Sequence, residues 1–357
     1  MTTKHYELLE QFALEGKPIV CDRHGCGHIN ETYKVLTDAP HRYILQKLSG
    51  QAFKDVPGLM NNIRLVTEYL RRHSEKDRRV VNLIRTVNGE SCLHVGEDYW
   101  RVYDYVEDSV VLQTPRNAQD FYESAIAFGE FQTKLADFPV EQLVETIPNF
   151  HNTVDRYRIF KETLAKDPCG RAKDVQEEIA FVLSKEEEMA TLQRMRESGE
   201  LPTRVTHNDT KLNNVLLKED TYKPLCVIDL DTVMPGLSLY DFGDSIRFGA
   251  ATAAEDEKDL DKVEMSLDMF RIFTKGFLTA CTTLTDRELE MLPMGAKTMT
   301  MECGVRFLTD YLDGDHYFAV HREGHNLDRC RTQFKLVSDM ESKWEEMHQI
   351  VKEVSGR

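Results

Sequence analysis

The alternation of apolar and polar positions along the chain changes character near residue 107. Before this point, short runs rich in Val, Ile, Leu and Tyr are separated by polar turns, a pattern typical of strands. A short amphipathic helix is expected over residues 6–14, and a longer one over 58–73. The expected strands cover residues 19–22, 33–36, 43–48, 80–87, 91–95 and 99–106.

After residue 107 the apolar positions recur at intervals of three and four, which predicts helices. A stripe from Val337 to Val354 is shorter than three heptads, so it indicates packing on the helical part rather than a coiled coil. We therefore expect two domains, residues 1–107 and 108–357. The expected helices cover residues 121–135, 170–198 (ended by Gly199) and 265–278, and the methionines between 291 and 301 are expected in the core.

One pair of apolar runs within the helical region predicts an antiparallel hairpin. Residues 215–217 and 225–228 are apolar, and the residues between them are polar. Asn214 precedes the first strand and Asp229 ends the second. In such a hairpin their side chains should meet within roughly 5 Å.

The residues leading into this hairpin form an H-x-D-x4-N motif, in which His207, Asp209 and Asn214 are the fixed positions. Asp209 is placed to accept the proton of a substrate hydroxyl. The amide oxygen of Asn214 and the carboxylate of Asp229 suit Mg²⁺. This set provides the chemistry needed to transfer the γ-phosphoryl group of ATP. The alternative is that these residues only cap loops.

Residues 24–32 are expected to form a glycine-containing turn over phosphates. Gly25 and Gly27 allow backbone N–H groups to approach an anion, and Asn30 and Thr32 follow them. A plain hairpin turn is the alternative. The turn also contains Cys26 and His28 close to Cys21 and His24, which could bind zinc, although the spacing is tighter than in usual zinc sites.

Strand 43–48 is expected to supply a phosphate-contacting lysine, Lys47. Gln46 and Lys47 point to opposite faces, so an error of one residue in register would exchange them. Glu68, on the helix over 58–73, is the candidate partner of this lysine, with a solvated glutamate as the alternative. Adenine is expected to bind backbone groups near Tyr105 and Val106.

Composition narrows the choice of partners. The chain has 357 residues, of which 41% are apolar, and its net charge is −16. Such an acidic surface argues against nucleic acid and anionic membranes as partners. No apolar run approaches the length of a membrane span, the N-terminus lacks a signal-peptide pattern, and the cysteines are scattered. We expect a cytoplasmic monomer.

Several other nucleotide-binding patterns do not fit. The G-x4-G-K-[ST] phosphate loop and the dinucleotide-binding G-x-G-x-x-G are missing from the sequence. A protein kinase would have Arg where Asn208 stands and D-F-G where Asp229-Leu230-Asp231 stands. These departures favour a kinase of small molecules.

The motif around His207, Asp209 and Asn214, with Asp229 and the run Tyr240-Asp241-Phe242-Gly243-Asp244, resembles the aminoglycoside phosphotransferase and choline kinase family. Within it, residues 206–217 and 227–249 are similar to bacterial N-acetylhexosamine 1-kinases. The resemblance implies a two-lobed, protein-kinase-like α+β fold, with a small antiparallel β lobe carrying one helix and a larger, mostly helical C-terminal lobe. It also implies ATP and Mg²⁺ as cofactors, with Asp209 as the base and Asn214 and Asp229 as metal ligands.

The implied activity is phosphorylation of the anomeric hydroxyl of N-acetylglucosamine or N-acetylgalactosamine. Two alternatives stay open: a kinase acting on an aminoglycoside, choline or another hydroxyl acceptor, and a nucleotide-binding module without activity. A neutral sugar needs polar groups and a flat apolar surface. The candidate sugar contacts are Asp209, Asp231, Thr232, Asp241, Arg306, Tyr317 and Trp344.

Overall fold

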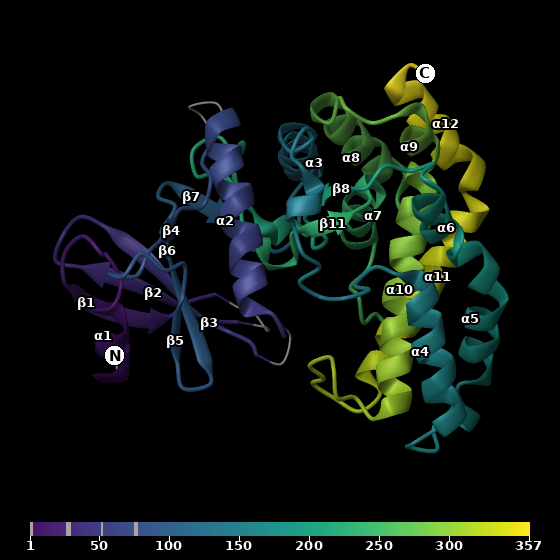
Figure 1. Ribbon diagram of the computed structural model, residues 1–357. Helices are drawn as coiled ribbons and strands as arrows, with labels where there is room; N and C mark the ends of the chain where they lie inside the picture. Colours follow the sequence, from purple (N-terminus) through teal and green to yellow (C-terminus); the bar gives the residue numbers. More distant parts are fainter. Residues whose placement is uncertain (1–2, 26–29, 51–52, 75–77) are drawn as a thin grey trace. The chain divides into compact units, whose positions relative to one another are not determined.

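The structure is a computed structural model that describes residues 3–25, 30–50, 53–74 and 78–357 (Figure 1). Its internal contacts divide the chain into two compact units. The first unit comprises Met1–Val111, Asp137–Pro148 and Val215–Pro235, and the second comprises Leu112–Ala136, Asn149–Asn214 and Gly236–Arg357. The expected α+β organisation, with a strand-rich unit and a larger helical one, is confirmed. The chain returns to the first unit twice after residue 111.

The first unit is built on an antiparallel sheet with strand order β1-β2-β3-β6-β4, in which β5 also pairs with β6. Helix α1 (Thr3–Leu9) covers one face, where Leu8 and Leu9 pack in a core with Trp100. The neighbouring Arg101 points to the other face and contacts Met60 of helix α2 (Val56–His73). The strands are β1 (Pro18–Arg23), β2 (Glu31–Thr37), β3 (Arg42–Leu48), β4 (Leu83–Ile84), β5 (Leu93–Val95) and β6 (Asp98–Asp104).

The expected hairpin is confirmed as β9 (Val215–Lys218) and β10 (Pro224–Val227). Strand β7 (Ser109–Val111) pairs with β9 and completes a three-stranded sheet in the order β10-β9-β7. Val215 lies opposite Val227. Asn214 directly precedes this pair of positions and Asp229 follows it by two residues, so both leave the hairpin from the same end.

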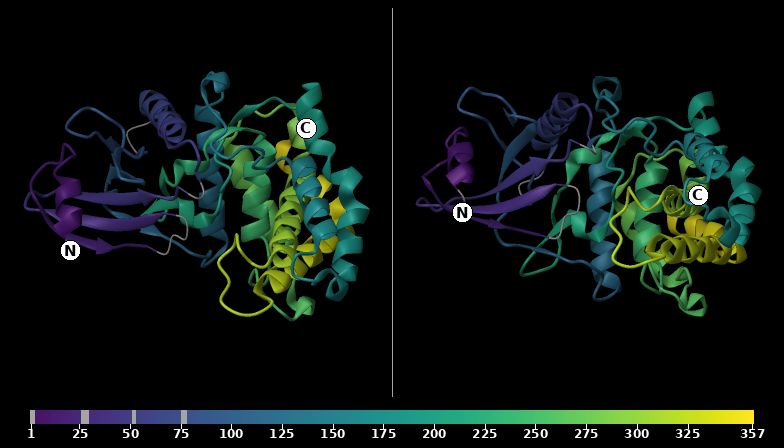
Figure 2. Two further views of the ribbon diagram at one scale, coloured as in Figure 1. Left: turned by 60° about the horizontal axis from the view of Figure 1, so that its bottom comes forward. Right: turned by 90° about the horizontal axis from the view of Figure 1, so that it is seen from below.

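The second unit is a helical bundle around the long helix α10, which packs against α4, α7 and α11, while α3 packs against α8. Figure 2 shows this bundle from two further sides. Its helices are α3 (Ala118–Lys134), α4 (Thr153–Lys166), α5 (Gln176–Met189), α6 (Thr191–Ser198), α7 (Ser238–Gly249), α8 (Leu267–Ala280), α9 (Asp286–Glu290), α10 (Leu292–Asp313), α11 (His325–Ser342) and α12 (Trp344–Ser355). Two short strands, β8 (Arg204–Thr206) and β11 (Met234–Gly236), lead into and out of the loops that carry the motif residues.

Helices α7 and α10 approach each other so closely that glycine is required where they meet. A Cβ atom on Gly243 would lie 2.3 Å from the carbonyl oxygen of Gly295, and one on Gly295 would lie 2.7 Å from the carbonyl oxygen of Leu239. The backbones of the two helices therefore contact each other directly, with no side chain between them.

Some expected elements differ from the structure. The single helix expected over 170–198 is two helices, because the chain breaks at Ala190, although Gly199 ends the second helix in the left-handed conformation as predicted. The strand expected over 80–87 shortens to Leu83–Ile84. Of the methionines expected in the core, Met299 and Met301 are buried, whereas Met291 and Met294 are half-buried. In the described part of the chain, no helix combines the length and apolarity needed to cross a membrane.

Candidate functional site

The H-x-D-x4-N motif lies in a loop of the second unit, residues 207–214, which we name the catalytic loop after its predicted role. Strand β8 ends at Thr206, and the loop closes in a short 3-10 turn over Leu212–Asn214. The first position of the motif, His207, is fully buried, and its ring packs edge-on against Phe128 and Phe131 of α3 at centroid distances of 5.5 and 5.8 Å. This packing fixes the start of the loop on the bundle.

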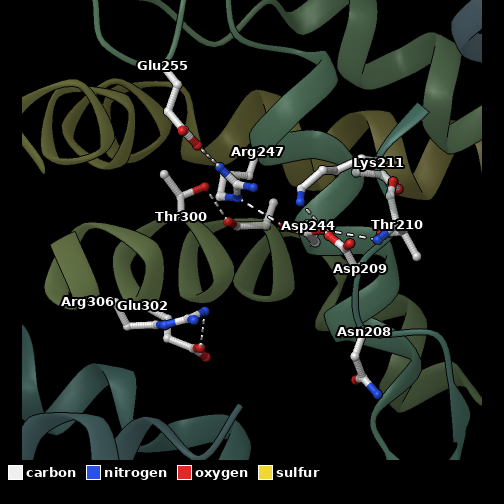
Figure 3. A network of polar contacts seen from close by, with 12 residues as sticks. Asn208, Asp209, Thr210, Lys211, Asp244, Arg247, Glu255, Thr300, Glu302 and Arg306 are labelled. Carbon is white, nitrogen blue, oxygen red and sulfur yellow. Dashed lines mark hydrogen bonds and ion pairs between the residues drawn. The ribbon is translucent and has the colours of Figure 1, made fainter. Parts of the chain in front are cut away.

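Asp209 is the carboxylate of the catalytic loop, and a quarter of its side chain is exposed. The Nζ atom of Lys211 lies 2.7 Å from its Oδ1 atom (Figure 3). The Nδ2 atom of Asn214 donates to its Oδ2 atom at 3.0 Å. Burial alone would raise the pKa of Asp209, but Lys211, His207 and Asn214 lower it below its usual value. Asp209 therefore stays ionised near neutral pH and can accept a hydrogen bond from a hydroxyl group.

Asp241 holds the beginning of the catalytic loop through hydrogen bonds to its backbone. It lies in the first turn of α7, and its carboxylate accepts hydrogen bonds from the backbone N–H groups of His207 at 2.9 Å and Asn208 at 2.7 Å. The side-chain amide of Gln132 donates to the same carboxylate. Burial raises the pKa of Asp241. Since its oxygens bind the loop itself, the structure gives Asp241 a positioning role in place of the expected sugar contact.

Asp244, one turn further along α7, braces the middle of the same loop. Its Oδ2 atom accepts from the backbone N–H of Thr210 at 3.1 Å, and its Oδ1 atom accepts from Arg247 at 3.0 Å. Arg247 is buried and also donates to Glu255, as Figure 3 shows. We did not predict this brace. The i, i+3 spacing of the two aspartates on α7 was the available signal, since it places both on one helix face.

Residues 228–232, the metal turn, lie in the first unit beyond the end of β10. Asp229 has the left-handed conformation (φ 61°, ψ 56°), which directs the chain into a 3-10 turn. Asp231 is buried, with both oxygens facing the guanidinium of Arg101 and one accepting from the amide of Asn30 at 2.5 Å. Asp231 therefore anchors the metal turn to β6, and its oxygens are not directed to a sugar as expected.

The residues predicted to hold Mg²⁺ fit the ion chemically. The Nδ2 atom of Asn214 donates to the backbone and side chain of Asp209, so the amide oxygen of Asn214 is turned away from Asp209. An amide oxygen and a carboxylate are hard donors of the kind that Mg²⁺ prefers. When bound, the ion would neutralise charge on the ATP phosphates.

The sheet register corrects the predicted role of Lys47. Lys47 lies opposite Trp100 on the face covered by α1 and forms an ion pair with Asp98 at 2.9 Å. Gln46 occupies the other face and accepts from Arg101 at 2.9 and 2.7 Å. As expected, the two neighbours point to opposite faces, but it is Gln46 that shares a face with the metal turn.

The expected ion pair between Lys47 and Glu68 is therefore wrong. Glu68 lies on α2, which covers the Gln46 face of the sheet, and it pairs with Arg64 and Arg85 instead. The cation nearest to the metal turn is Arg101, which is buried and paired with Asp231.

The structure describes only part of residues 24–32, which we name the phosphate turn after its predicted role. Gly27, Cys26 and His28 lie outside the described residues. Gly25 has φ +76° with open space around it, which agrees with a tight turn. The side chain of Asn30 donates to Asp231 and accepts from the backbone N–H of Ser49 at 3.0 Å, and that of Thr32 accepts from Gln46.

The zinc alternative rests partly on undescribed positions as well. Of its four residues, Cys21 is buried in the core under α1, and the His24 ring packs edge-on against Tyr105. Among the residues whose placement is described, no group of three or more His, Cys, Asp and Glu residues is arranged to hold a metal ion.

The predicted adenine-binding segment lies directly after β6. The backbone N–H of Tyr105 donates to the carbonyl of Arg42 at 3.0 Å, and the carbonyl of Val106 accepts from the Ser109 hydroxyl at 2.6 Å. These two groups are already used within the protein. The ring of Tyr105 lies under the Nζ atom of Lys34 at 4.3 Å.

Two of the sugar contacts predicted in the second unit contact each other. Arg306 and Tyr317 meet, since the guanidinium donates to the phenol oxygen at 3.2 Å and lies near the rings of Phe150 and Phe318. Tyr317 is 68% exposed, so its ring is available to a ligand. Trp344, also in the second unit, packs beside Lys297 and His348. Thr232, in the first unit, is buried in the metal turn.

Arg306 belongs to a group of charges around one buried carboxylate, Glu302. Arg156 and Arg306 each approach a Glu302 oxygen to 3.9 Å, and His151 approaches it to 3.0 Å. Burial and the neighbouring Arg306 lower the pKa of Arg156. In the described part of this group, arginines outnumber carboxylates two to one.

Comparison with known proteins identifies the motif region. The model of the phosphotransferase enzyme family matches residues 21–264. This span contains the sheet, the catalytic loop, the metal turn and the two aspartates of α7, and it covers more than half of the chain.

Solved structures share the fold. An aminoglycoside phosphotransferase from Alicyclobacillus acidocaldarius subsp. acidocaldarius DSM 446 has a TM-score of 0.65 at 12% identity, over 99% of this chain and 97% of that one. A microcompartment-associated aminopropanol kinase has a TM-score of 0.62 at 14% identity, over 97% and 98%. A spectinomycin phosphotransferase in complex with ADP and spectinomycin has a TM-score of 0.61 at 12% identity, over 97% and 99%. The two-lobed, kinase-like α+β fold is thus confirmed.

Proposed function

Because this chain belongs to the phosphotransferase enzyme family, we propose that it transfers the γ-phosphoryl group of ATP to the anomeric hydroxyl of an N-acetylhexosamine. The family and fold identify a small-molecule phosphotransferase, for which ATP and Mg²⁺ are the usual cofactors. The identity of the acceptor is the proposed part. It rests on the sequence resemblance and on the charges around Glu302.

In the proposed reaction, the C1 hydroxyl oxygen of the sugar attacks the γ-phosphorus of ATP. The bond from this phosphorus to the β–γ bridging oxygen breaks, and ADP leaves. Asp209 orients the hydroxyl and receives its proton. A loose transition state asks for little proton removal before bond formation, so a carboxylate with a lowered pKa is sufficient.

The observation that carries the acceptor assignment is the positive group beside an exposed aromatic ring. Arg306 can donate to a carbonyl or hydroxyl oxygen, and Tyr317 offers a flat surface to a sugar ring. The group is linked to the catalytic loop, because His151 contacts both Glu302 and the backbone carbonyl of Asn208. An excess of positive charge here disfavours a cationic acceptor by like-charge repulsion.

The second candidate is an amine-bearing acceptor, as the names of the aminopropanol kinase and the aminoglycoside phosphotransferase suggest for those proteins. The strongly acidic composition of this chain would suit a cation. However, the local charge at Arg156 and Arg306 has the opposite sign. A module without activity is disfavoured because Asp209, Asn214 and Asp229 are all present.

The decisive experiment compares acceptors that share a sugar ring but differ in charge at one substituent. N-acetylglucosamine and glucosamine share one ring, but glucosamine carries an ammonium group where the first has an acetamide. ATP consumption is measured with both sugars, N-acetylgalactosamine, choline and kanamycin, and phosphorus NMR identifies the phosphorylated position. We expect a sugar 1-phosphate from the acetylated sugars and at least roughly tenfold lower kcat/KM with glucosamine. Turnover with the cations alone would refute the assignment.

A matched pair of arginine variants tests the contact itself. Arg306→Met should raise the KM for the acetylated sugar more than it lowers kcat. Arg331→Met is the control, because Arg331 lies on α11 and pairs with Glu178. Equal kinetics for the two variants would remove Arg306 from the acceptor site.

A further inference from the structure

His151 joins the charged group to the catalytic loop. It lies just before α4 and is 8% exposed. Its Nδ1 atom is 3.0 and 3.2 Å from the two oxygens of Glu302, and its Nε2 atom is 3.2 Å from the backbone carbonyl oxygen of Asn208. Both nitrogens of one buried ring therefore face oxygen atoms.

The chemistry of these partners determines the protonation of the ring. A backbone carbonyl can only accept, so Nε2 must carry a hydrogen. An ionised carboxylate can also only accept, so Nδ1 must carry one too, and the ring is then an imidazolium. A protonated Glu302 would allow a neutral ring, but Arg156 and Arg306 favour the carboxylate. Although burial would raise the pKa of Glu302, His151 and the two arginines lower it.

The carbonyl that His151 holds belongs to the peptide that leads into Asp209. Asn208 has the left-handed conformation (φ 65°), which Asn adopts more readily than most non-glycine residues, and hydrogen bonds hold it there. Its N–H group donates to Asp241, its side-chain oxygen accepts from Thr206, and its carbonyl accepts from His151. With both ends of Asn208 held, the direction in which Asp209 leaves the turn is determined.

We propose that His151, as an imidazolium held by Glu302, is a positioning residue that orients the Asn208–Asp209 peptide for phosphoryl transfer. Glu302 is shared with Arg306, so the same carboxylate supports the loop and the proposed acceptor contact. The readout of turnover rests on the proposed function, whereas the protonation of the ring does not.

The charged and titratable groups that face the ring, among the described residues, come from three helices. They are Glu302 and Arg306 of α10, Arg156 of α4, and Tyr240 of α7, whose ring lies 5.2 Å from that of His151. Burial raises the pKa of Tyr240, so this phenol stays neutral over the pH range of the experiment.

Two isosteric variants separate the contacts of the ring. His151→Gln retains a donor in the place of Nε2, which faces the loop, and His151→Asn retains one in the place of Nδ1, which faces Glu302. We expect His151→Gln to stay within about threefold of the wild-type kcat. His151→Asn should lose roughly 10- to 100-fold in kcat, since the loop is no longer held. The matched control is His94→Gln, because His94 is an exposed residue of β5.

Nitrogen-15 NMR of the imidazole ring measures the protonation directly and needs no acceptor. Two protonated nitrogens on His151 at pH 7 support the proposal, and a neutral ring overturns it. Equal losses of kcat in the Asn and Gln variants would show that the ring only stabilises the fold, which also overturns it. If no sugar is phosphorylated, the proposed function fails, and the same comparison is made on the ATP hydrolysis rate, where equal rates for the two variants overturn the positioning role.

Discussion

Two buried aspartates, ten positions apart in the sequence, hold the metal turn and the catalytic loop by different means. Asp231, in the first unit, faces the guanidinium of Arg101, so its charge has a cationic partner. Asp241, in the second unit, faces two backbone N–H groups and the amide of Gln132. The metal turn thus depends chiefly on one charged contact between segments 130 residues apart, to which Asn30 adds a hydrogen bond, whereas the catalytic loop is held by several uncharged donors. We therefore expect that removing the cationic partner of Asp231 lowers the free energy of unfolding more than weakening the hydrogen bonds of Asp241.

The largest expected effect is on kcat, and it distinguishes Asp209, the proposed proton acceptor, from the aspartates that hold the chain in position. Asp209→Asn should lower kcat by about 10²–10⁴, because the substrate hydroxyl loses its proton acceptor. ATP binding, measured by calorimetry, should persist. Asp220→Asn is the matched control, since Asp220 is exposed in the turn between β9 and β10. Near-native turnover of the Asp209 variant would show that another group accepts the proton.

The next effect breaks the charge pair of the metal turn. Arg101→Met leaves Asp231 buried without its cation, which should cost about 3–5 kcal/mol in the free energy of unfolding. Adding Asp231→Leu removes the uncompensated charge and should recover much of this loss. Chemical denaturation of both variants measures the difference. A double variant as unstable as the sum of its single variants would contradict the pairing.

Breaking the dipolar arrangement should cost less. Asp241→Asn keeps one acceptor oxygen but turns an NH₂ group toward N–H donors. The expected loss is about 1–3 kcal/mol in the free energy of unfolding. Turnover should fall as well, because the beginning of the catalytic loop is released. The same denaturation experiment provides the comparison with Arg101→Met, and a larger loss for Asp241→Asn would reverse the contrast.

The pH dependence of turnover sharpens the comparison further. The pKa of Asp209 is lowered in the folded protein, so the stabilisation from its ionised form is present above its unfolded pKa and is lost as pH falls through the folded one. Lys211→Met removes a cation that lowers this pKa, and the acidic limb of the pH–rate profile should therefore move to higher pH. Lys223→Met, on the exposed hairpin turn, is the control. An unmoved limb would exclude Lys211 as the cause.

The smallest effect tests the corrected face of the sheet. Lys47→Met should leave the KM for ATP within about twofold, because its partly exposed pair with Asp98 contributes about 0–1 kcal/mol. Gln46→Ala should raise the KM for ATP more, since Gln46 supports Arg101. A tenfold rise in the KM for ATP in the Lys47 variant alone would show that Lys47 contacts the ATP phosphates after all.

Much of the candidate site was predictable because its residues are close in the sequence. Asp209, Asn214 and Asp229 lie within a loop and a hairpin, so spacing and alternation were sufficient to predict the paired strands. The pairing of Lys47 was not predictable in this way, because a single step along a strand exchanges its two faces. The face is decided by packing against α1 and α2, which the local pattern does not record.

Long-range partners were equally inaccessible. No pattern in the sequence around Arg101 indicates that its side chain is buried and paired with an aspartate 130 residues later. In the sequence, Asp241 looks like a polar residue that contacts a ligand. The observed N–H donors show instead that its carboxylate binds the backbone of the catalytic loop. The single helix expected over 170–198 failed for a related reason, because a break at Ala190 without glycine or proline leaves no local mark.

The glycine contact between α7 and α10 constrains how such a kinase could acquire a new acceptor. Gly243 and Gly295 bring main chain against main chain, so the spacing of the two helices is already at its steric minimum. Larger residues at either position would push the aspartates of α7 away from the catalytic loop. Laboratory evolution toward another alcohol should therefore accumulate substitutions on the exposed rim near Tyr317 and leave this crossing unchanged.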